Sequence, residues 1–131
     1  MKIFKSVILL AIVLLTSSPL SAKTPFDEVV NSVATALRAG HVKNLCSNFV
    51  NSVSLSIKRD ERVYTRFQAE LLLDDFFRSN KVSQLKELQR ANSSTNSFVV
   101  YSLRTSTTTY RVFVKFTETN KVYKVVELRI E

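Results

Sequence analysis

Cysteine, glycine and histidine are each represented by a single residue in this 131-residue chain. The lone cysteine, Cys46, excludes an internal disulfide, so packing must stabilise the fold, and it lies too far from the N-terminus to carry a lipoprotein's lipid. His41 and Cys46 alone do not supply the clustered ligands of a zinc site. Gly40 alone leaves no glycine-rich loop for a nucleotide phosphate and no nucleophile elbow. The sequence therefore predicts no metal and no cofactor.

A long hydrophobic run is missing as well. The apolar stretch near the N-terminus covers only Val7 to Leu15, well short of the roughly 20 residues that a spanning helix needs. Lys2 and Lys5 precede it, and small residues ending at Ala22 follow it. This pattern is typical of a cleavable secretory signal over residues 1–22 and predicts export to the periplasm or the medium.

Acidic residues are outnumbered, with 11 against 19 basic residues and a net charge of +8 that includes Lys2 and Lys5. A basic balance favours acidic partners, although it also serves solubility. Export argues against nucleic acid, which leaves anionic glycans, lipid headgroups or acidic proteins as partners.

After the signal, residues 23–131 have the size of one small domain with one core. Apolar residues repeat with helical spacing in three segments and with a period of two in the others. The predicted helices are Pro25 to Ala39, Val42 to Phe49 and Arg66 to Asn80, and the predicted strands are Ser52 to Ile57, Val63 to Tyr64, Ser83 to Arg90, Ser97 to Thr105, Thr108 to Thr117 and Val122 to Ile130.

The element order is helix, helix, short hairpin, helix and then four consecutive strands, without the strand–helix alternation of a doubly wound fold. Short connections between successive strands favour antiparallel pairing. We therefore predict an α+β domain in which three helices pack on one side of a curved antiparallel sheet.

Alternation in the last two strands predicts which side chains face the core. In the first of these strands, alternate residues that are apolar form one face. In the next strand, a second set of alternate apolar residues forms the matching face. These sets are Tyr110, Val112, Val114 and Phe116, and then Val122, Val126, Leu128 and Ile130. The opposite face carries Phe113, Tyr123 and Val125 among charged residues, which is typical of a partner-binding surface. The simplest partner is a second copy of the chain in a homodimer.

Several short segments carry a family resemblance. Ala36 to Gly40, Leu45, Phe49 and Val53-Ser54-Leu55, in this element order, resemble the cystatin-like cone of the nuclear-transport-factor-two-like superfamily. More narrowly, the chain is similar to a family of small exported bacterial proteins of unknown function. The segments that carry this narrower likeness are Gln68-Ala69-Glu70, Asp75-Phe76-Phe77 with Asn80, Thr109-Tyr110-Arg111 and Glu127 to Glu131.

The resemblance implies a cone with a ligand pocket between helices and sheet, and pairing through the outer face of the sheet. Tyr64, Tyr101 and Tyr110 are the candidate pocket residues. Superfamily enzymes place an acid–base pair inside the cone, so a carboxylate beside one of these tyrosines would favour a small isomerase or dehydratase.

The chain itself offers no clear catalytic pair. His41 falls between the first two helices, where a turn or cap role is expected. Asp74 and Asp75 are adjacent, and helical geometry directs their side chains about 100° apart. The sequence therefore predicts a non-catalytic exported module that binds an apolar ligand or a protein partner. The alternatives are the small enzyme and a surface module for anionic envelope polymers, which requires clustered basic residues.

Overall fold

The computed structural model describes residues 23–131, which form three helices and one six-stranded sheet. The predicted signal over residues 1–22 lies outside the described residues. Within the described part, no helix has the length and apolar character needed to cross a membrane. The elements are α2 (Pro25–Ala39), α3 (Val42–Cys46), β1 (Phe49–Ile57), β2 (Asp60–Thr65), α4 (Arg66–Ser79), β3 (Val82–Asn92), β4 (Ser97–Thr105), β5 (Thr109–Thr119) and β6 (Val122–Ile130).

Helix α2 begins and ends where its local sequence favours it. The Thr24 hydroxyl accepts the Asp27 backbone N–H at 3.1 Å, and the Asp27 carboxylate accepts the Thr24 backbone N–H. This reciprocal capping box satisfies amides that have no partner within the helix. Gly40 follows the helix with φ of 64°, a left-handed conformation that glycine adopts without strain.

Helix α3 is shorter than its sequence spacing predicts. It ends at Cys46, and Phe49 begins β1 instead of completing the helix. Phe49 is nevertheless fully buried, because the chain turns onto the sheet with this side chain directed to the core. His41 is the N-cap of α3, and its Nδ1 atom accepts the Asn44 backbone N–H at 3.4 Å. The predicted cap role of His41 is therefore confirmed.

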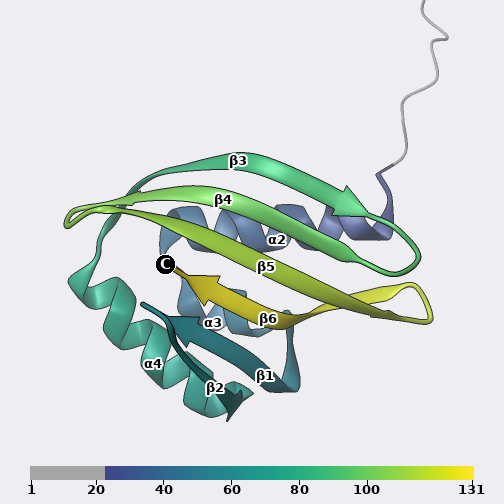
Figure 1. Ribbon diagram of the computed structural model, residues 1–131, viewed down its shortest axis with the longest axis horizontal. Helices are drawn as coiled ribbons and strands as arrows, with labels where there is room; N and C mark the ends of the chain where they lie inside the picture. The colour runs from purple at the N-terminus through teal and green to yellow at the C-terminus, as the bar shows by residue number, and fades with distance from the viewer. Residues whose placement is uncertain (1–22) are drawn as a thin grey trace, which may run out of the picture.

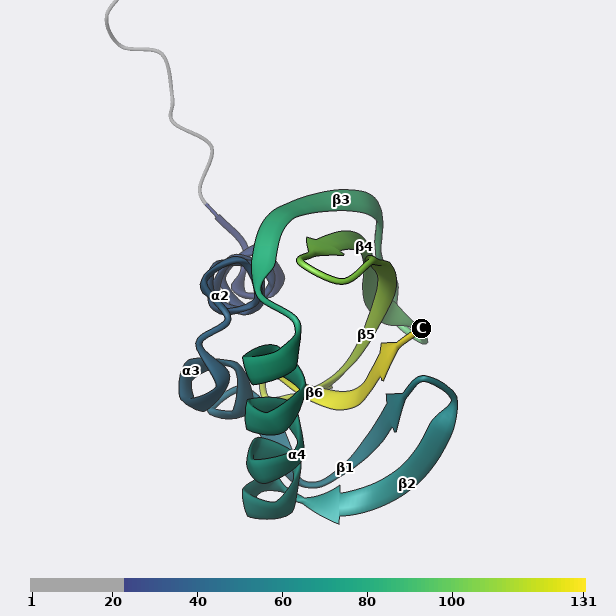
Figure 2. The ribbon, with the colours of Figure 1, turned by 90° about the vertical axis from the view of Figure 1, so that its left-hand side faces the viewer.

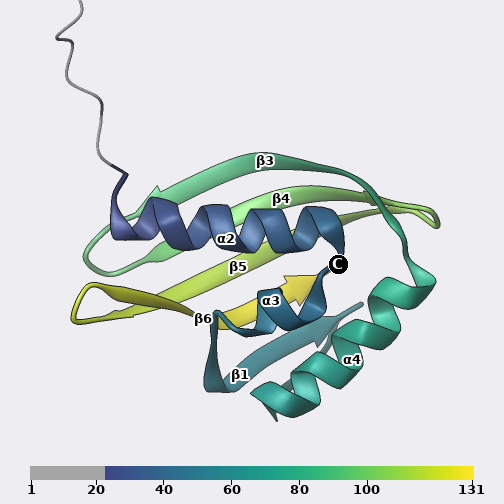
Figure 3. The same cartoon turned by 180° about the vertical axis from the view of Figure 1, so that it is seen from behind.

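The strands form one curved sheet in the order β2-β1-β6-β5-β4-β3. Figure 1 looks onto the outer face of this sheet, Figure 2 shows its curvature from the side, and Figure 3 shows the three helices lying against its inner face. Four of the neighbouring pairs are antiparallel, as the short connections predict. The pairing of β1 with β6 is parallel, which the prediction of an antiparallel sheet did not include.

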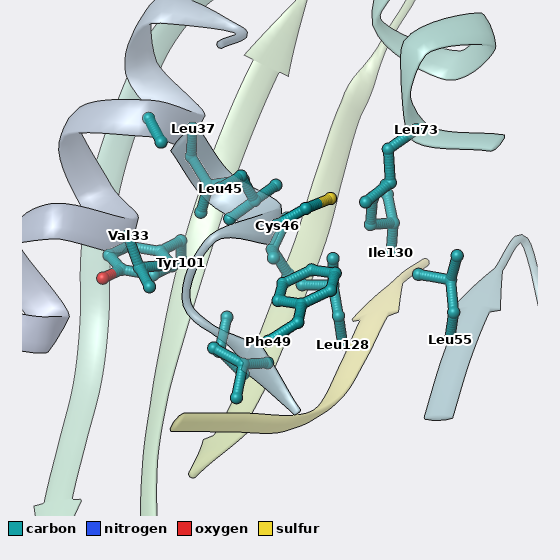
Figure 4. Close-up of a cluster of buried hydrophobic side chains, with 14 of the residues drawn as sticks. Val33, Leu37, Leu45, Cys46, Phe49, Leu55, Leu73, Tyr101, Leu128 and Ile130 are labelled. Carbon is teal, nitrogen blue, oxygen red and sulfur yellow. The ribbon is translucent and has the colours of Figure 1, made fainter. Parts of the chain in front are cut away.

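The core fills the space between the helices and the inner face of the sheet. Side chains from α2, α3, α4 and the sheet meet there, including Leu37, Leu45, Leu73 and Leu128 (Figure 4). Each of these four side chains is at most 1% exposed. Such burial of apolar area is the main favourable contribution to folding, about 25 cal/mol for each Å².

A β-bulge in β6 changes the predicted core face of that strand. Lys115 pairs with Glu127 and the next residue, Phe116, pairs with Val125, so Val126 is an extra residue in β6. An extra residue reverses the inward and outward alternation on the N-terminal side of the bulge. Leu128 and Ile130 are buried as predicted, whereas Val126 is half-buried and Val122 is 55% exposed, so the core assignment of these two valines is wrong.

Candidate functional site

The three tyrosines predicted to line a pocket lie in three different environments. Tyr101 points into the core near Val33 of α2 (Figure 4), with 1% of its surface exposed. Its hydroxyl is buried and has no hydrogen-bond partner among the described residues. Burial, the largest cause, raises the pKa of this hydroxyl well above its ordinary value. Tyr101 is therefore a core residue.

Tyr110 belongs to a polar contact at the end of α4. Its hydroxyl donates to Asn80 Oδ1 at 3.0 Å, and Asn80 Nδ2 donates to the Phe76 carbonyl at 2.8 Å. The Thr107 hydroxyl donates to the same Asn80 oxygen. Both Tyr110 and Asn80 are buried, so these hydrogen bonds join β5 to the C-terminus of α4 and leave Asn80 Oδ1 with two donors. The polar side chains of this cluster therefore have their hydrogen-bond partners within the protein.

Tyr64 lines a small hollow of about 60 Å³ together with Leu55, Ile57, Asp60 and Leu72. Pockets for organic ligands typically enclose roughly 300–1,000 Å³. A carboxylate beside one of the three tyrosines would favour an enzyme, and Asp60 is the carboxylate that shares this hollow with Tyr64. Its side chain is 69% exposed and lies 3.4 Å from the Arg62 guanidinium, so it lacks the desolvation that a carboxylic general acid or base requires.

A larger hollow of about 440 Å³ lies between the β3–β4 and β5–β6 turns. Its lining is dominated by hydroxyl and amide side chains of the segment 92–97, with Tyr123 and Glu118 from the other hairpin. An apolar ligand would leave these polar groups without water or partners. This hollow therefore does not support the apolar-ligand prediction.

Cys46 lies in the core, as its helical spacing predicts, with 1% of its surface exposed. Burial, assisted by the negative charges of Glu70 and Asp74, raises the pKa of its thiol to about 12. The thiol is therefore protonated at neutral pH and is a poor nucleophile.

Phe113 lies on the outer face of the sheet, as predicted, and two further apolar residues of β4 join it there. The rings of Phe98 and Phe113 have centroids 5.6 Å apart at an angle of 31°, and Val100 pairs with Phe113 across the strands. Val100 is only 4% exposed although it lies outside the main core. The Arg129 guanidinium lies 5.8 Å from the Phe113 ring centroid. We call Phe98, Val100 and Phe113 the outer aromatic cluster.

Tyr123 and Val125 do not join this cluster, and their predicted place on the outer face is wrong. Val125 is fully buried in the core, and the Tyr123 ring packs on the inner side against Phe26 with centroids 5.3 Å apart. The bulge at Val126 is the cause, because it reverses the alternation of every β6 residue that precedes it.

Sequence reasoning missed Phe98 and Val100. The signal was present, since β4 is apolar on both of its faces: Phe98 and Val100 alternate with Val99 and Tyr101. An almost continuous apolar strand in an antiparallel sheet indicates that its outer face is also covered or used.

Basic residues gather on the same outer face. The pairing register and the alternation of side chains place six of them there, with Glu61, Glu127 and Glu131 as acidic neighbours. Among the ion pairs of residues 23–131, one involves this basic set: Arg129 with Glu127 at 3.1 Å. The six basic residues are Lys86, Arg104, Arg111, Lys115, Lys124 and Arg129.

The curved sheet with three helices on its inner face defines this protein as a member of the NTF2-like fold class. Crystal structures of NTF2-like proteins of unknown function share it, for example the one from Burkholderia xenovorans, with 13% identity, a TM-score of 0.63, and coverage of 82% of this chain and 81% of that chain. The chain belongs to the family described as "Domain of unknown function (DUF4783)", whose model matches residues 30–131.

Crystal structures of the same family agree with this assignment. A DUF4783 family protein from Bacteroides fragilis has 27% identity and a TM-score of 0.71, covering 76% of this chain and 93% of that chain. One from Bacteroides uniformis has 23% identity and a TM-score of 0.75, covering 79% and 95%. No curated protein matches the chain. The predicted NTF2-like fold and the predicted membership of a family of unknown function are thereby confirmed.

Proposed function

We propose that this protein is a non-catalytic exported binding module that forms a homodimer through the outer face of its sheet. The observation that carries this proposal is the outer aromatic cluster. Phe98 and Phe113 are half-buried on the face opposite the helices, where no element of residues 23–131 covers them. The filled interior of the cone supports a surface function over an internal ligand site.

The outer aromatic cluster has the composition of an interface centre. Aromatic residues are enriched at the desolvated centres of protein interfaces, and charged residues are typical of the rim. In a two-fold dimer the same patch meets its own copy, so Phe113 of one protomer would contact the cluster of its partner. A stable interface buries about 800 Å² on each partner. The six strands of the sheet supply a continuous face over which such an area can form.

The basic residues around the outer aromatic cluster predict how the affinity of the dimer depends on salt. Lys115 and Arg129 flank Phe113 in the sheet register, so a two-fold axis through the cluster brings like charges of two protomers toward each other. Salt shortens the screening length from about 10 Å at 0.1 M to about 3 Å at 1 M. We therefore expect the dimer to tighten as the salt concentration rises.

Sedimentation velocity over a concentration series tests the proposal. We expect the wild type to be a dimer at tens of micromolar and Phe113→Glu to be folded but monomeric. Removing a carboxylate from water at the interface centre costs about 2 kcal/mol or more, which is at least about a 30-fold weaker dimer. Circular dichroism of each variant reports that the fold is retained.

Phe67→Glu is the matched control, because Phe67 of α4 is 70% exposed and lies away from the outer face. It should leave the dimer intact. A monomeric wild type contradicts the proposal, and so does a dimer that survives Phe113→Glu but dissociates with Phe67→Glu.

Export is tested separately by intact-mass measurement of the protein recovered from fractionated cells. We expect a mature chain that begins at Lys23 or within about two residues of it and remains outside the cytoplasmic and membrane fractions. Recovery of the uncleaved chain in the membrane fraction would contradict export.

A further inference from the structure

One end of the outer face holds a depression of about 280 Å³ on strands β3, β4 and β5. Its lining consists of two cationic side chains and three neutral hydrogen-bonding side chains. These residues are Gln84, Lys86, Ser102, Arg104 and Thr109. The depression lies at the opposite end of β4 from Phe98 and is separated from the outer aromatic cluster by the strand register.

The register determines how these side chains converge. Ser102 lies between Lys86 of β3 and Arg111 of β5, whereas Arg104 lies between Gln84 and Thr109. Neighbouring strands are about 4.8 Å apart, and side chains on one face repeat every second residue. Lys86 and Arg104 are therefore diagonal neighbours whose long side chains can reach one group above the Ser102 hydroxyl.

The charge of the depression is not balanced by the protein. Its lining contains no carboxylate, and neither Lys86 nor Arg104 forms an ion pair within residues 23–131. The neighbouring Arg111 pairs through its backbone with Glu131, and the alternation of side chains places Glu131 on the outer face beside it. Lys86 and Arg104 are thus two cations at diagonal positions of the register, and neither has an ion-pair partner in the described part of the chain.

We propose that this depression binds a phosphate monoester. Two unpaired cations match the dianionic charge that a phosphate monoester carries above its second pKa of about 6. The Arg104 guanidinium can donate two parallel hydrogen bonds to phosphate oxygens, and Lys86 supplies a point charge. The Ser102 and Thr109 hydroxyls and the Gln84 amide supply further donors for the remaining oxygen. A carboxylate or a sulfate monoester, each with one negative charge, leaves one cation unbalanced.

Nuclear magnetic resonance of the ¹⁵N-labelled domain tests this site with methyl phosphate, methyl sulfate and acetate at constant ionic strength and pH 7.5. We expect methyl phosphate to shift the amide signals of residues 84–86, 102–104 and 109 and to bind more tightly than the other two anions. Lys86→Gln and Arg104→Gln should each weaken methyl phosphate binding by about tenfold. Lys43→Gln, on α3 behind the sheet, is the control and should not change it.

Vesicles distinguish the source of the phosphate. Binding to vesicles that contain phosphatidic acid, but not to phosphatidylcholine vesicles, would assign a lipid headgroup. Methyl phosphate binding without vesicle binding would assign a soluble ester.

The proposal is overturned if methyl phosphate shifts signals at basic residues throughout the domain, if acetate binds equally well, or if Lys43→Gln weakens binding as much as Arg104→Gln. A monomeric wild type would leave this inference intact, because the site is complete in one chain.

Discussion

The buried hydroxyl of Tyr101 allows a sharp test of the core. This oxygen has no hydrogen-bond partner among the described residues, and the Tyr101 side chain is 1% exposed. A buried hydroxyl without a partner costs about 1–3 kcal/mol. Tyr101→Phe removes the hydroxyl and keeps the ring, so we expect the variant to be more stable than the wild type by about 1 kcal/mol or more.

Tyr110→Phe is the matched comparison, because the Tyr110 hydroxyl does have a partner, Asn80 Oδ1 at 3.0 Å. Loss of such a hydrogen bond costs about 0.5–1.5 kcal/mol. The same chemical change should therefore stabilise the protein at Tyr101 and destabilise it at Tyr110. For a domain of about 100 residues, 1 kcal/mol corresponds to a change in Tm of about 4–8 °C, which thermal unfolding followed by circular dichroism resolves.

The pH dependence gives Tyr101 a second signature. Burial raises its pKa in the folded state above the ordinary value of 10.0, so the folded protein holds this proton more tightly than the unfolded chain does. This contribution to stability is complete below pH 10 and is lost as the pH rises above it. Tyr101→Phe should lose less stability above pH 10 than the wild type. A variant that is less stable than the wild type by more than about 0.5 kcal/mol at pH 7 would refute the reasoning.

Three further predictions concern individual side chains. Cys46 should react with a thiol reagent such as dithiobis(nitrobenzoate) only upon unfolding, and rapid labelling of the native protein would contradict its burial. Because burial raises the pKa of the Cys46 thiol from 9.0 to about 12, the contribution of this thiol to stability should decline as the pH rises above 9. Thr65→Ala removes the capping box of α4 and should lower the free energy of unfolding by about 0.5–2 kcal/mol in urea titrations, whereas Thr117→Ala, at an exposed strand position, should change it little. His41→Ala should cost less than about 1 kcal/mol and leave self-association unchanged in sedimentation; loss of the dimer in a folded variant would show that His41 does more than cap α3.

Local sequence signals predicted the fold because they agree with one another along most of the chain. Helices α2 and α4 begin at the predicted capping residues Thr24 and Thr65, and α2 ends at Gly40 as predicted. Strand β5 shows the predicted alternation from Tyr110 to Phe116. Connections of a few residues predicted the antiparallel pairs. The parallel pairing of β1 with β6 has no such local signal, since it joins strands that are far apart in the sequence.

The outer surface was predicted less well, and for two of its three predicted residues the reason is a single extra residue in β6. The extra Val126 reverses the alternation in β6, which moves Val125 to the core and Tyr123 to the inner side. Alternation read without the bulge therefore assigned Phe113 correctly and these two residues incorrectly. Phe98 and Val100 could have been found by extending the same analysis to β4, where both faces are apolar.

The place of β6 in the sheet has a consequence for how the protein reaches its folded state. The last strand in the sequence lies between β1 and β5, so it joins the first hairpin to the rest of the sheet. Pairings such as Leu55 with Leu128 close a long loop, and folding dominated by such distant contacts is slow. A ribosome-bound chain that lacks β6 has two separate sheet fragments with open edges. The domain therefore completes its sheet only after β6 has been synthesised.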